Sequence, residues 1–257
     1  MATSGTGTIE ALYRYPVKGL TPEPLESVEL VPMGTLPFDR AYAIENGPGP
    51  FDPANPQHLQ KIHFVMLMRN EELATVRSAF DDETETLVIS KAGAEIARGD
   101  LRTEAGRAAI EDAIIRIVTS GLRGRPRVVV SPGHSFSDVK DKCVHIVNRQ
   151  SLASLEGMLG APLDARRFRP NLVVDNIAAW SELDLVGKKL RVNGTTLEIF
   201  KRTERCAATN VDPETGARDQ KIPSFLSKTL GHTDFGVYAR VLDGGRLTVG
   251  DSFQVTD

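Results

Sequence analysis

The sequence predicts a mainly β fold with a few helices, of the α+β class. Short apolar runs alternate with Gly, Pro and Asn turns through most of the 257 residues, and two stretches have the three-to-four spacing of an amphipathic helix. A hydrophobic content of 40% is enough to build a core, in either one large β-rich domain or two modest ones.

Four apolar runs in the first hundred residues end in turn residues and are expected to be strands. They are "SVELVPMG" (27–34), "RAYAIENGPG" (40–49), "KIHFVMLMRN" (61–70) and "ETLVISKAG" (85–93). The stretch "NEELATVRSAF" (70–80) fits a helix or a hairpin arm about as well, and its β-branched and aromatic residues favour a strand. The Pro- and Gly-rich segment 47–58 is expected to be an exposed loop.

Two amphipathic helices are predicted. The first lies between residues 103 and 118, behind a Thr103 N-cap, and is the expected seam between two halves of the chain. Its apolar stripe consists of Ile110, Ala113, Ile114 and Ile117. The second begins at about Ser151 and ends at Gly160, with a stripe made by Leu152, Leu155 and Leu159.

Strands are expected around and after the second helix. The runs "RVVVS" (127–131) and "CVHIVN" (143–148) precede it. Beyond it, "KKLRV" and "TLEIF" flank Asn193-Gly194, which is a strong hairpin signal, and "GVYARVL" and "RLTVG" flank the "DGG" at 243–245. Each pair is expected to form a hairpin.

Composition excludes several classes of protein. A net charge of −3 argues against a general nucleic-acid binder. Two cysteines without regular spacing cannot build a disulfide framework, so a reducing, cytoplasmic setting is expected. The N-terminal stretch has no apolar segment of signal type and no window has the roughly 18 apolar residues of a membrane span, so no membrane association is expected.

The motif "RCAATNVDPETG" (205–216) places Cys206 at an expected strand end, beside a loop and close to Lys201, Arg202 and Arg205. Nearby cations stabilise a thiolate, the form that binds metals and attacks electrophiles. A small buried hydrophobe is an equally good interpretation of this cysteine from context alone. Cys143 lies in an apolar strand pattern, so a structural role in the core is expected for it.

A second group of candidates is cationic and comes from separate loops. Arginine forks and a lysine that converge would suit a phosphate monoester, because bidentate hydrogen bonds and point charge both favour a dianion. Taken singly, each of these side chains fits a solvated surface position better. The group consists of Lys18, Arg40, Arg166, Arg167 and Arg169.

Together these stretches resemble the MOSC family, named for the C-terminal domain of molybdenum cofactor sulfurase, and in particular its two-part members related to the mitochondrial amidoxime reducing component. The resemblance is carried in fixed order by "LYRYPVKGL", "FDRAYAI", "RFRPNLVVDN", "AWSELDLVGKKLRV", "KRTERCAATNVDPETG" and "FGVYARVLDGGRLTVGDSF". It implies a β-barrel MOSC domain at 125–257, preceded by a β-rich N-terminal domain at 1–124.

The resemblance also implies a molybdenum cofactor, in which Cys206 ligates a molybdenum ion held by a pterin dithiolene. A soft thiolate suits a sulfur-ligated transition metal. By the same resemblance the phosphate of the pterin would be bound by Lys18, Arg40 and Arg169. Further hydrogen bonds to the cofactor would come from Asn148, Asn171 and Arg205. Gly19 stands where related sequences often have serine, so one hydroxyl contact near the phosphate is expected to be missing.

The function implied is a molybdenum cofactor-dependent oxidoreductase that reduces small N-oxygenated (N-hydroxylated) compounds with electrons from a separate donor protein. Asp212 and Glu204 are candidate proton donors because they are close to Cys206 in the sequence. Two alternatives remain open. One is a non-redox protein that carries the molybdenum cofactor or its sulfur, and the other is a metal-free thiol enzyme that uses Cys206.

Overall fold

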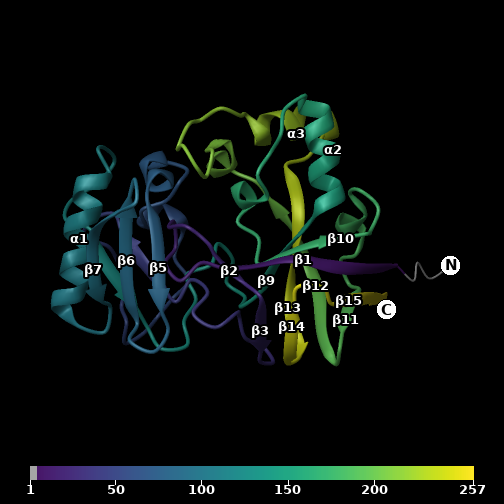
Figure 1. Cartoon of the computed structure of the whole chain (residues 1–257), viewed down its shortest axis with the longest axis horizontal. Helices are drawn as coiled ribbons and strands as arrows, with labels where there is room; N and C mark the ends of the chain where they lie inside the picture. The colour runs from purple at the N-terminus through teal and green to yellow at the C-terminus, as the bar shows by residue number, and fades with distance from the viewer. Residues whose placement is uncertain (1–4) are drawn as a thin grey trace.

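The computed structural model describes residues 5–257 and has two lobes side by side (Figure 1). One lobe contains α1 and the sheet of β5, β6 and β7, and the other is a β-barrel with α2 and α3 at one end. The fold is mainly β, as predicted. No helix within residues 5–257 has the length and apolar character needed to cross a membrane. The expectation about the N-terminal stretch concerns in part residues 1–4, which lie outside the described residues.

The barrel is a closed sheet of seven strands in the order β10, β9, β13, β12, β11, β15 and β1, and pairing between β1 and β10 closes it. Alternate residues of the strands face its interior, so that Leu190 and Val192 of β11 are buried while Arg191 is exposed. The strands are β1 (Thr6–Arg14), β9 (Val144–Asn148), β10 (Leu172–Asp175), β11 (Lys189–Val192), β12 (Thr195–Glu204), β13 (Asp234–Asp243) and β15 (Ser252–Thr256).

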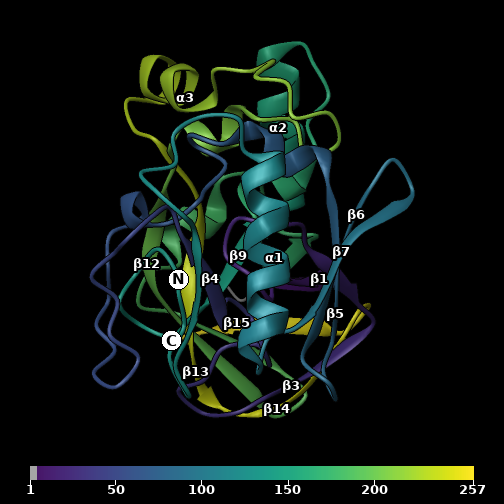
Figure 2. The same cartoon turned by 90° about the vertical axis from the view of Figure 1, so that its left-hand side faces the viewer.

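The other lobe is built on two small sheets and one helix. Helix α1 (Glu104–Ile117) covers the sheet beside β7, and its predicted apolar stripe is buried (Figure 2). The Thr103 hydroxyl accepts a hydrogen bond from the Gly106 amide at 3.0 Å, which confirms the predicted N-cap. The strands are β4 (Tyr42–Glu45), β5 (Arg77–Asp81), β6 (Thr86–Lys91), β7 (Ala94–Asp100) and β8 (Arg127–Val130), with β4 paired to β8.

Strand pairing crosses the predicted domain division in both directions. The first strand, β1, closes the barrel, β2 (Glu23–Leu25) pairs with β1, and β3 (Ser27–Leu30) pairs with β14 (Gly245–Thr248). Conversely, β8 lies after residue 124 but pairs with β4 in the other lobe. The chain therefore passes between two hydrophobic cores, and the division at 124/125 stays a prediction.

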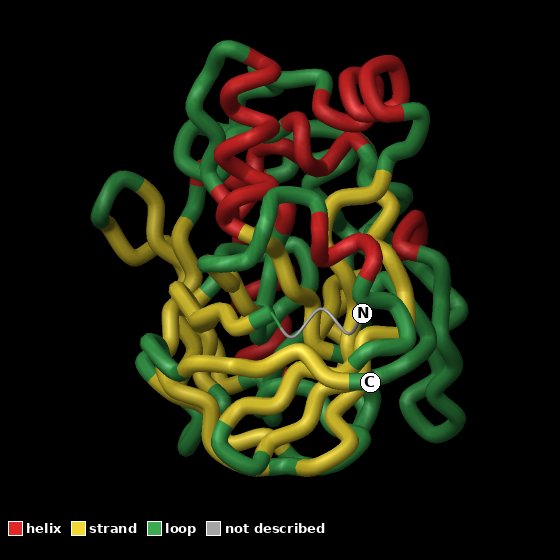
Figure 3. Tube along the Cα trace, turned by 90° about the vertical axis from the view of Figure 1, so that its right-hand side faces the viewer, coloured by secondary structure: helices red, strands yellow, loops and turns green. Residues whose placement is uncertain are grey.

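Helices α2 (Arg149–Leu159) and α3 (Ile222–Leu230) lie at one end of the barrel (Figures 1 and 3). Helix α2 confirms the second predicted helix and begins two residues earlier, because the Asn148 side chain caps it. Gly160 ends it with φ 68°, as predicted. Helix α3 was not predicted, since nine residues give little periodicity; its signals are a proline in the first turn and Gly231 after the last.

Two strand predictions were wrong in whole or in part. In "KIHFVMLMRN" the chain forms a short 3-10 helix (Lys61–His63), a single bridge from Phe64 to Glu45, and a turn, so no strand develops. Phe64, Val65 and Met66 are buried whereas Ile62 is exposed, and the Asn70 side chain holds the turn through the Met66 amide and the Ser120 carbonyl. The stretch 70–80 splits into a 3-10 helix (Glu71–Thr75) and strand β5, so the prediction is correct for its second half.

The Asn193-Gly194 hairpin is confirmed, with both residues at positive φ between β11 and β12. The second predicted hairpin was wrong, because β14 pairs with β3 rather than with β13. Gly244 passes so close to β3 that a Cβ there would lie 2.5 Å from the Leu30 carbonyl oxygen. The glycines thus allow two backbone segments to lie close together and do not form a two-residue hairpin turn. Segment 47–58 is irregular and mostly exposed, as predicted, with Phe51 buried against Phe136.

Candidate active site

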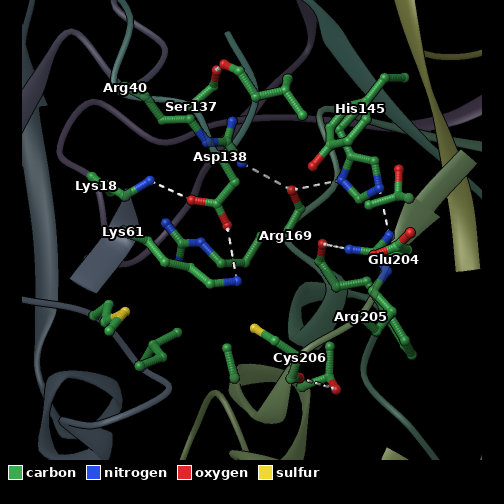
Figure 4. Close-up of a pocket in the computed structure, with 18 of the residues that line it drawn as sticks. Lys18, Arg40, Lys61, Ser137, Asp138, His145, Arg169, Glu204, Arg205 and Cys206 are labelled. Atoms are coloured by element: carbon green, nitrogen blue, oxygen red, sulfur yellow. Dashed lines mark hydrogen bonds and ion pairs between the residues drawn. The ribbon is translucent and has the colours of Figure 1, made fainter. Parts of the chain in front are cut away.

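A cavity of about 270 Å³ opens where the two lobes meet (Figure 4). Six of the seven predicted site residues line it, from both halves of the chain: Lys18, Arg40, Arg169, Asn171, Arg205 and Cys206. The seventh, Asn148, does not line it. The amide nitrogen of Asn148 donates to the Ala178 carbonyl and to Glu182, and its oxygen caps α2. A cofactor contact by Asn148 therefore stays a prediction that the arrangement of the pocket does not support.

Cys206 is a half-buried free thiol between the end of β12 and a 3-10 turn (Ala207–Asn210), at the strand end where it was predicted. Its sulfur points into the pocket (Figure 4). The amide and the hydroxyl of Thr209 both donate to the Cys206 carbonyl, at 3.1 and 3.0 Å, which fixes the backbone beside the thiol. The first turn of this loop therefore presents the sulfur from a defined backbone position.

Ion pairs of Arg167 stabilise the rest of this loop. Its side chain is 2% exposed and donates to both carboxylate oxygens of Asp219, at 2.8 and 2.7 Å, and to Asp212 at 2.9 Å. Asp212 in turn accepts from the amides of Glu214 and Thr215. The role of Arg167 is therefore in organising the cysteine loop, although it also lines the pocket. Asp212 is not among the pocket residues.

Lys18 enters the pocket from the loop after β1. It is buried and donates to the Phe136 carbonyl at 2.7 Å and to the Asp138 carboxylate. Burial alone would raise the pKa of Asp138, but the ammonium of Lys18 outweighs this effect and holds that pKa well below its usual range. Lys61 adds a second cation 3.9 Å from Asp138. This corner of the pocket thus contains two lysines that share one carboxylate.

Arg40 and Arg169 lie over the same aromatic ring. Their guanidinium carbons are 4.6 and 4.1 Å from the centroid of the Tyr15 ring, and both residues have φ of 52°, in the left-handed region that non-glycine residues rarely adopt. Arg40 is paired with Asp39 and donates to the Arg169 carbonyl at 3.1 Å. Strained backbone at two adjacent arginines is typical of a functional site.

The Arg169 guanidinium is only partly satisfied. Its Nη1 donates to the Leu20 carbonyl at 2.8 Å, whereas its Nη2 is buried and has no hydrogen-bond partner within residues 5–257. Burial lowers the pKa of Arg169 to about 10, so the group still carries its charge at neutral pH. A buried donor without a partner is uncommon in native proteins and often marks the position of an absent group.

Arg205 and Asn171 complete the cationic side of the pocket. Arg205 donates to the carbonyls of Phe235 and Phe168, at 2.7 and 3.0 Å, and burial lowers its pKa to about 10. Gly236 leaves room for this side chain, since a Cβ there would lie 3.2 Å from Nη2 of Arg205. The amide nitrogen of Asn171 donates to the Tyr13 carbonyl and to Asp39, so Asn171 ties the barrel to the Arg40 loop.

The charges in the pocket favour an anionic ligand. Within residues 5–257, neither Arg169 nor Arg205 has a carboxylate within 4.0 Å, although Lys18 and Arg40 each have one. Burying a cation is costly unless a counter-charge or hydrogen bonds offset the lost hydration. A phosphate would supply both the charge and an acceptor for the free Nη2 of Arg169.

Other candidates lie at the edge of the pocket or outside it. Arg166 forms ion pairs with Asp164 and Glu214 and does not line the cavity. Glu204 is exposed and does line it. Cys143 is buried, as predicted, but it also lines the cavity, and burial raises the pKa of its thiol to about 12.

The pocket-lining residues that sequence reasoning missed include Lys61, Asp138, His145 and Tyr238. His145 had a usable signal, because a polar residue inside the otherwise apolar strand "CVHIVN" needs hydrogen-bond partners when buried. Asp138 and Lys61 come from irregular segments, and nothing in their local sequence points to a pocket.

The fold and the pocket define a two-lobed β-barrel protein with a cysteine opposite a cationic, anion-accepting wall. The chain belongs to the MOSC family: the MOSC domain matches residues 132–254 and the MOSC N-terminal beta barrel domain matches residues 6–124. These two matches confirm the resemblance drawn from the sequence.

Relatives include two amidoxime-reducing proteins and a sulfurase. Mitochondrial amidoxime-reducing component 1 of Homo sapiens is 25% identical over 288 residues, a match that covers 95% of this chain and 82% of the relative. Mitochondrial amidoxime reducing component 2 of Bos taurus is 31% identical over 120 residues, covering 42% of this chain and 35% of the relative. Molybdenum cofactor sulfurase of Drosophila willistoni is 31% identical over 111 residues, covering 42% of this chain and 14% of the relative.

Proposed function

We propose that this protein is a molybdenum cofactor-dependent oxidoreductase that reduces small N-oxygenated (N-hydroxylated) compounds, with electrons from a separate donor protein in the cytoplasm. The observation that carries the proposal is the pocket itself, in which one thiol faces partly buried arginines, one of which has a buried donor nitrogen without a partner within residues 5–257. The names of the two relatives that reduce amidoximes support the substrate class.

The residues present fit this cofactor. Lys18, Arg40 and Arg169 would bind its phosphate, and Arg205 would donate a further hydrogen bond. Cys206 would be the protein ligand of molybdenum. Residues 5–257 contain no group of three or more His, Cys, Asp or Glu that could hold a metal by themselves, so the metal would have to arrive with ligands of its own, as a pterin dithiolene provides.

When bound, the cofactor supplies a two-electron redox centre that accepts oxygen from the substrate. The chain's own residues hold and surround that centre. Stacking on Tyr15 and hydrogen bonds to backbone carbonyls hold the guanidiniums of Arg40 and Arg169 before an anion arrives, so less ordering is needed on binding. Glu204 lines the pocket next to Cys206 and has access to solvent, so it is the better placed of the two candidate proton donors, because Arg167 engages Asp212.

A carrier of the cofactor or its sulfur is the second candidate, favoured by the similarity to a molybdenum cofactor sulfurase. The test is to purify the chain from a host that makes the cofactor, to measure molybdenum and pterin per chain, and to assay an N-hydroxylated amidine with a chemical electron donor. Molybdenum and pterin each near one per chain, together with turnover of the amidine, would support the reductase. Cofactor without turnover supports the carrier. Absence of both metal and pterin would refute both and leave the metal-free thiol enzyme.

A further inference from the structure

His145 connects the arginines of the pocket to one another. Its imidazole lies on β9 and is buried, with 4% of the residue exposed. Each ring nitrogen has an arginine partner: Nδ1 lies 3.1 Å from the Arg169 carbonyl oxygen, and Nε2 contacts Nη2 of Arg205 (Figure 4). The ring therefore bridges the side chain of Arg205 and the backbone of Arg169, which come from separate parts of the chain.

The chemistry of these two partners fixes the tautomer of His145. A guanidinium has only donors, so Nε2 must accept, and a carbonyl oxygen has only lone pairs, so Nδ1 must carry the proton. Burial, and then the charge of Arg205, lowers the pKa of His145 well below its usual value. The imidazole is therefore neutral at pH 7, with its single proton on Nδ1.

The Arg169 carbonyl is the centre of a larger network. It accepts from Nδ1 of His145 at 3.1 Å and from Nη2 of Arg40 at 3.1 Å. Through this carbonyl and the imidazole, three arginines are joined in one chain of hydrogen bonds.

Arg205 has little freedom left once His145 is in place. Four hydrogen bonds occupy its guanidinium, which has five N–H donors: two to the Phe235 carbonyl, one to the Phe168 carbonyl and one to His145. Without an acceptor at Nε2 of His145, a buried N–H of Arg205 would lose its partner, and the guanidinium plane would tilt to recover one. The remaining N–H would then lose its direction toward a ligand.

We propose that His145 is a positioning residue of the anion site: as the neutral Nδ1–H imidazole it couples Arg205 to the Arg169 backbone and sets the direction in which the Arg205 guanidinium meets a phosphate monoester. This inference rests on the proposed function, since the phosphate belongs to that proposal. His145 itself touches no ligand in this scheme.

Three substitutions at His145 test its two hydrogen bonds one at a time and together. His145→Leu keeps most of the volume and removes both bonds. His145→Gln places an amide oxygen near the position of Nε2 and keeps the acceptor for Arg205, whereas His145→Asn places an amide nitrogen near Nδ1 and keeps the donor to Arg169. Dissociation constants for inorganic phosphate are measured by calorimetry on cofactor-free protein at one low ionic strength, with melting temperatures in parallel.

We expect His145→Leu to weaken phosphate binding about tenfold, His145→Gln to stay within about threefold of wild type, and His145→Asn to fall between them. In an Arg205→Gln background, His145→Leu should cost no more than about twofold, because the imidazole acts through that guanidinium. A purely structural role would lower the melting temperature of all three variants and leave the dissociation constants unchanged, which would overturn the proposal. So would tighter binding by His145→Leu.

A measurement on the wild-type chain tests the same inference without any variant. Long-range ¹H–¹⁵N spectra of protein labelled at histidine should show His145 as the neutral tautomer protonated on Nδ1. Protonation on Nε2, or an imidazolium at pH 7, would refute it. If neither wild type nor Arg169→Gln binds phosphate, the proposed phosphate site is refuted, and this inference is refuted with it. If wild type binds phosphate and the His145 variants bind it equally well, only the inference about His145 is refuted.

Discussion

Arg166 and Arg167 are neighbours in the chain with opposite surroundings, so replacing each by glutamine separates the effects of burial and of charge. Arg167 is 2% exposed and forms ion pairs with Asp219 and Asp212, whereas Arg166 is 31% exposed and pairs with Asp164 and Glu214. Both variants lose one positive charge and the same donors, and they place the same side chain on adjacent residues.

The expected loss for Arg167→Gln is about 2–3 kcal/mol of unfolding free energy. Breaking a buried ion pair costs about 3–5 kcal/mol when the charge left behind stays buried. Here the buried partner is the one removed, and Asp219 and Asp212, which are 41% and 24% exposed, can turn toward water, so the cost is smaller. For Arg166→Gln we expect at most about 1 kcal/mol, as for other exposed pairs.

The assay is urea unfolding of both variants and wild type, with the melting temperature as a second reading. About 2–3 kcal/mol corresponds to a fall of about 4–12 °C for a chain of this size. Arg167→Gln should also expose the cysteine loop to limited proteolysis, since that side chain holds Asp212. Equal losses for the two variants would show that Arg167 does not organise the loop and would refute the reasoning.

The remaining predictions concern the pocket. Cys206→Ser should change the spectrum of the metal centre and remove most activity while keeping the fold. Cys143→Ser should lose about 1–3 kcal/mol of unfolding free energy to a buried hydroxyl, and so melt at a lower temperature, yet keep its molybdenum. The reverse pattern would show that the ligand was assigned to the wrong cysteine. Arg40→Glu should lower cofactor content well before it lowers the melting temperature, and full cofactor content would contradict its role. Asp138→Asn should tighten inorganic phosphate binding several-fold, because it frees the ammonium of Lys18 from its carboxylate; unchanged binding, measured by calorimetry, would argue that Lys18 does not face the anion.

The parts of the fold that sequence predicted are those with local causes. Helix α1 follows from its apolar spacing and the Thr103 cap, and the β11–β12 hairpin follows from Asn193-Gly194, so each can be read within about fifteen residues. The pairing of β14 with β3 depends on strands more than two hundred residues apart, so no local signal could give it. The strand prediction for segment 61–70 was wrong because a short apolar run that contacts the core has the same sequence pattern in an extended strand and in a turn.

The site was predicted by family resemblance more than by its residues. Nothing local distinguishes the three arginines of "RRFRPN" from one another, yet Arg166 lies outside the pocket, Arg167 forms ion pairs with the cysteine loop and Arg169 lines the pocket beside Arg40. A short 3-10 turn (Ala165–Phe168) followed by the left-handed backbone of Arg169 sends these side chains in different directions. This geometry depends on tertiary packing, so it cannot be predicted from the conformational preferences of arginine.

The left-handed conformations of Arg40 and Arg169 connect the fold to the proposed chemistry. Each costs free energy that glycine would avoid, of order 1 kcal/mol or more, so arginine at both positions comes at a cost to stability. Stacking on the buried Tyr15 ring and the bonds at the Arg169 carbonyl offset part of that cost within the chain. The buried Nη2 of Arg169 has no partner within residues 5–257, and under the proposed function the phosphate would accept a hydrogen bond from it.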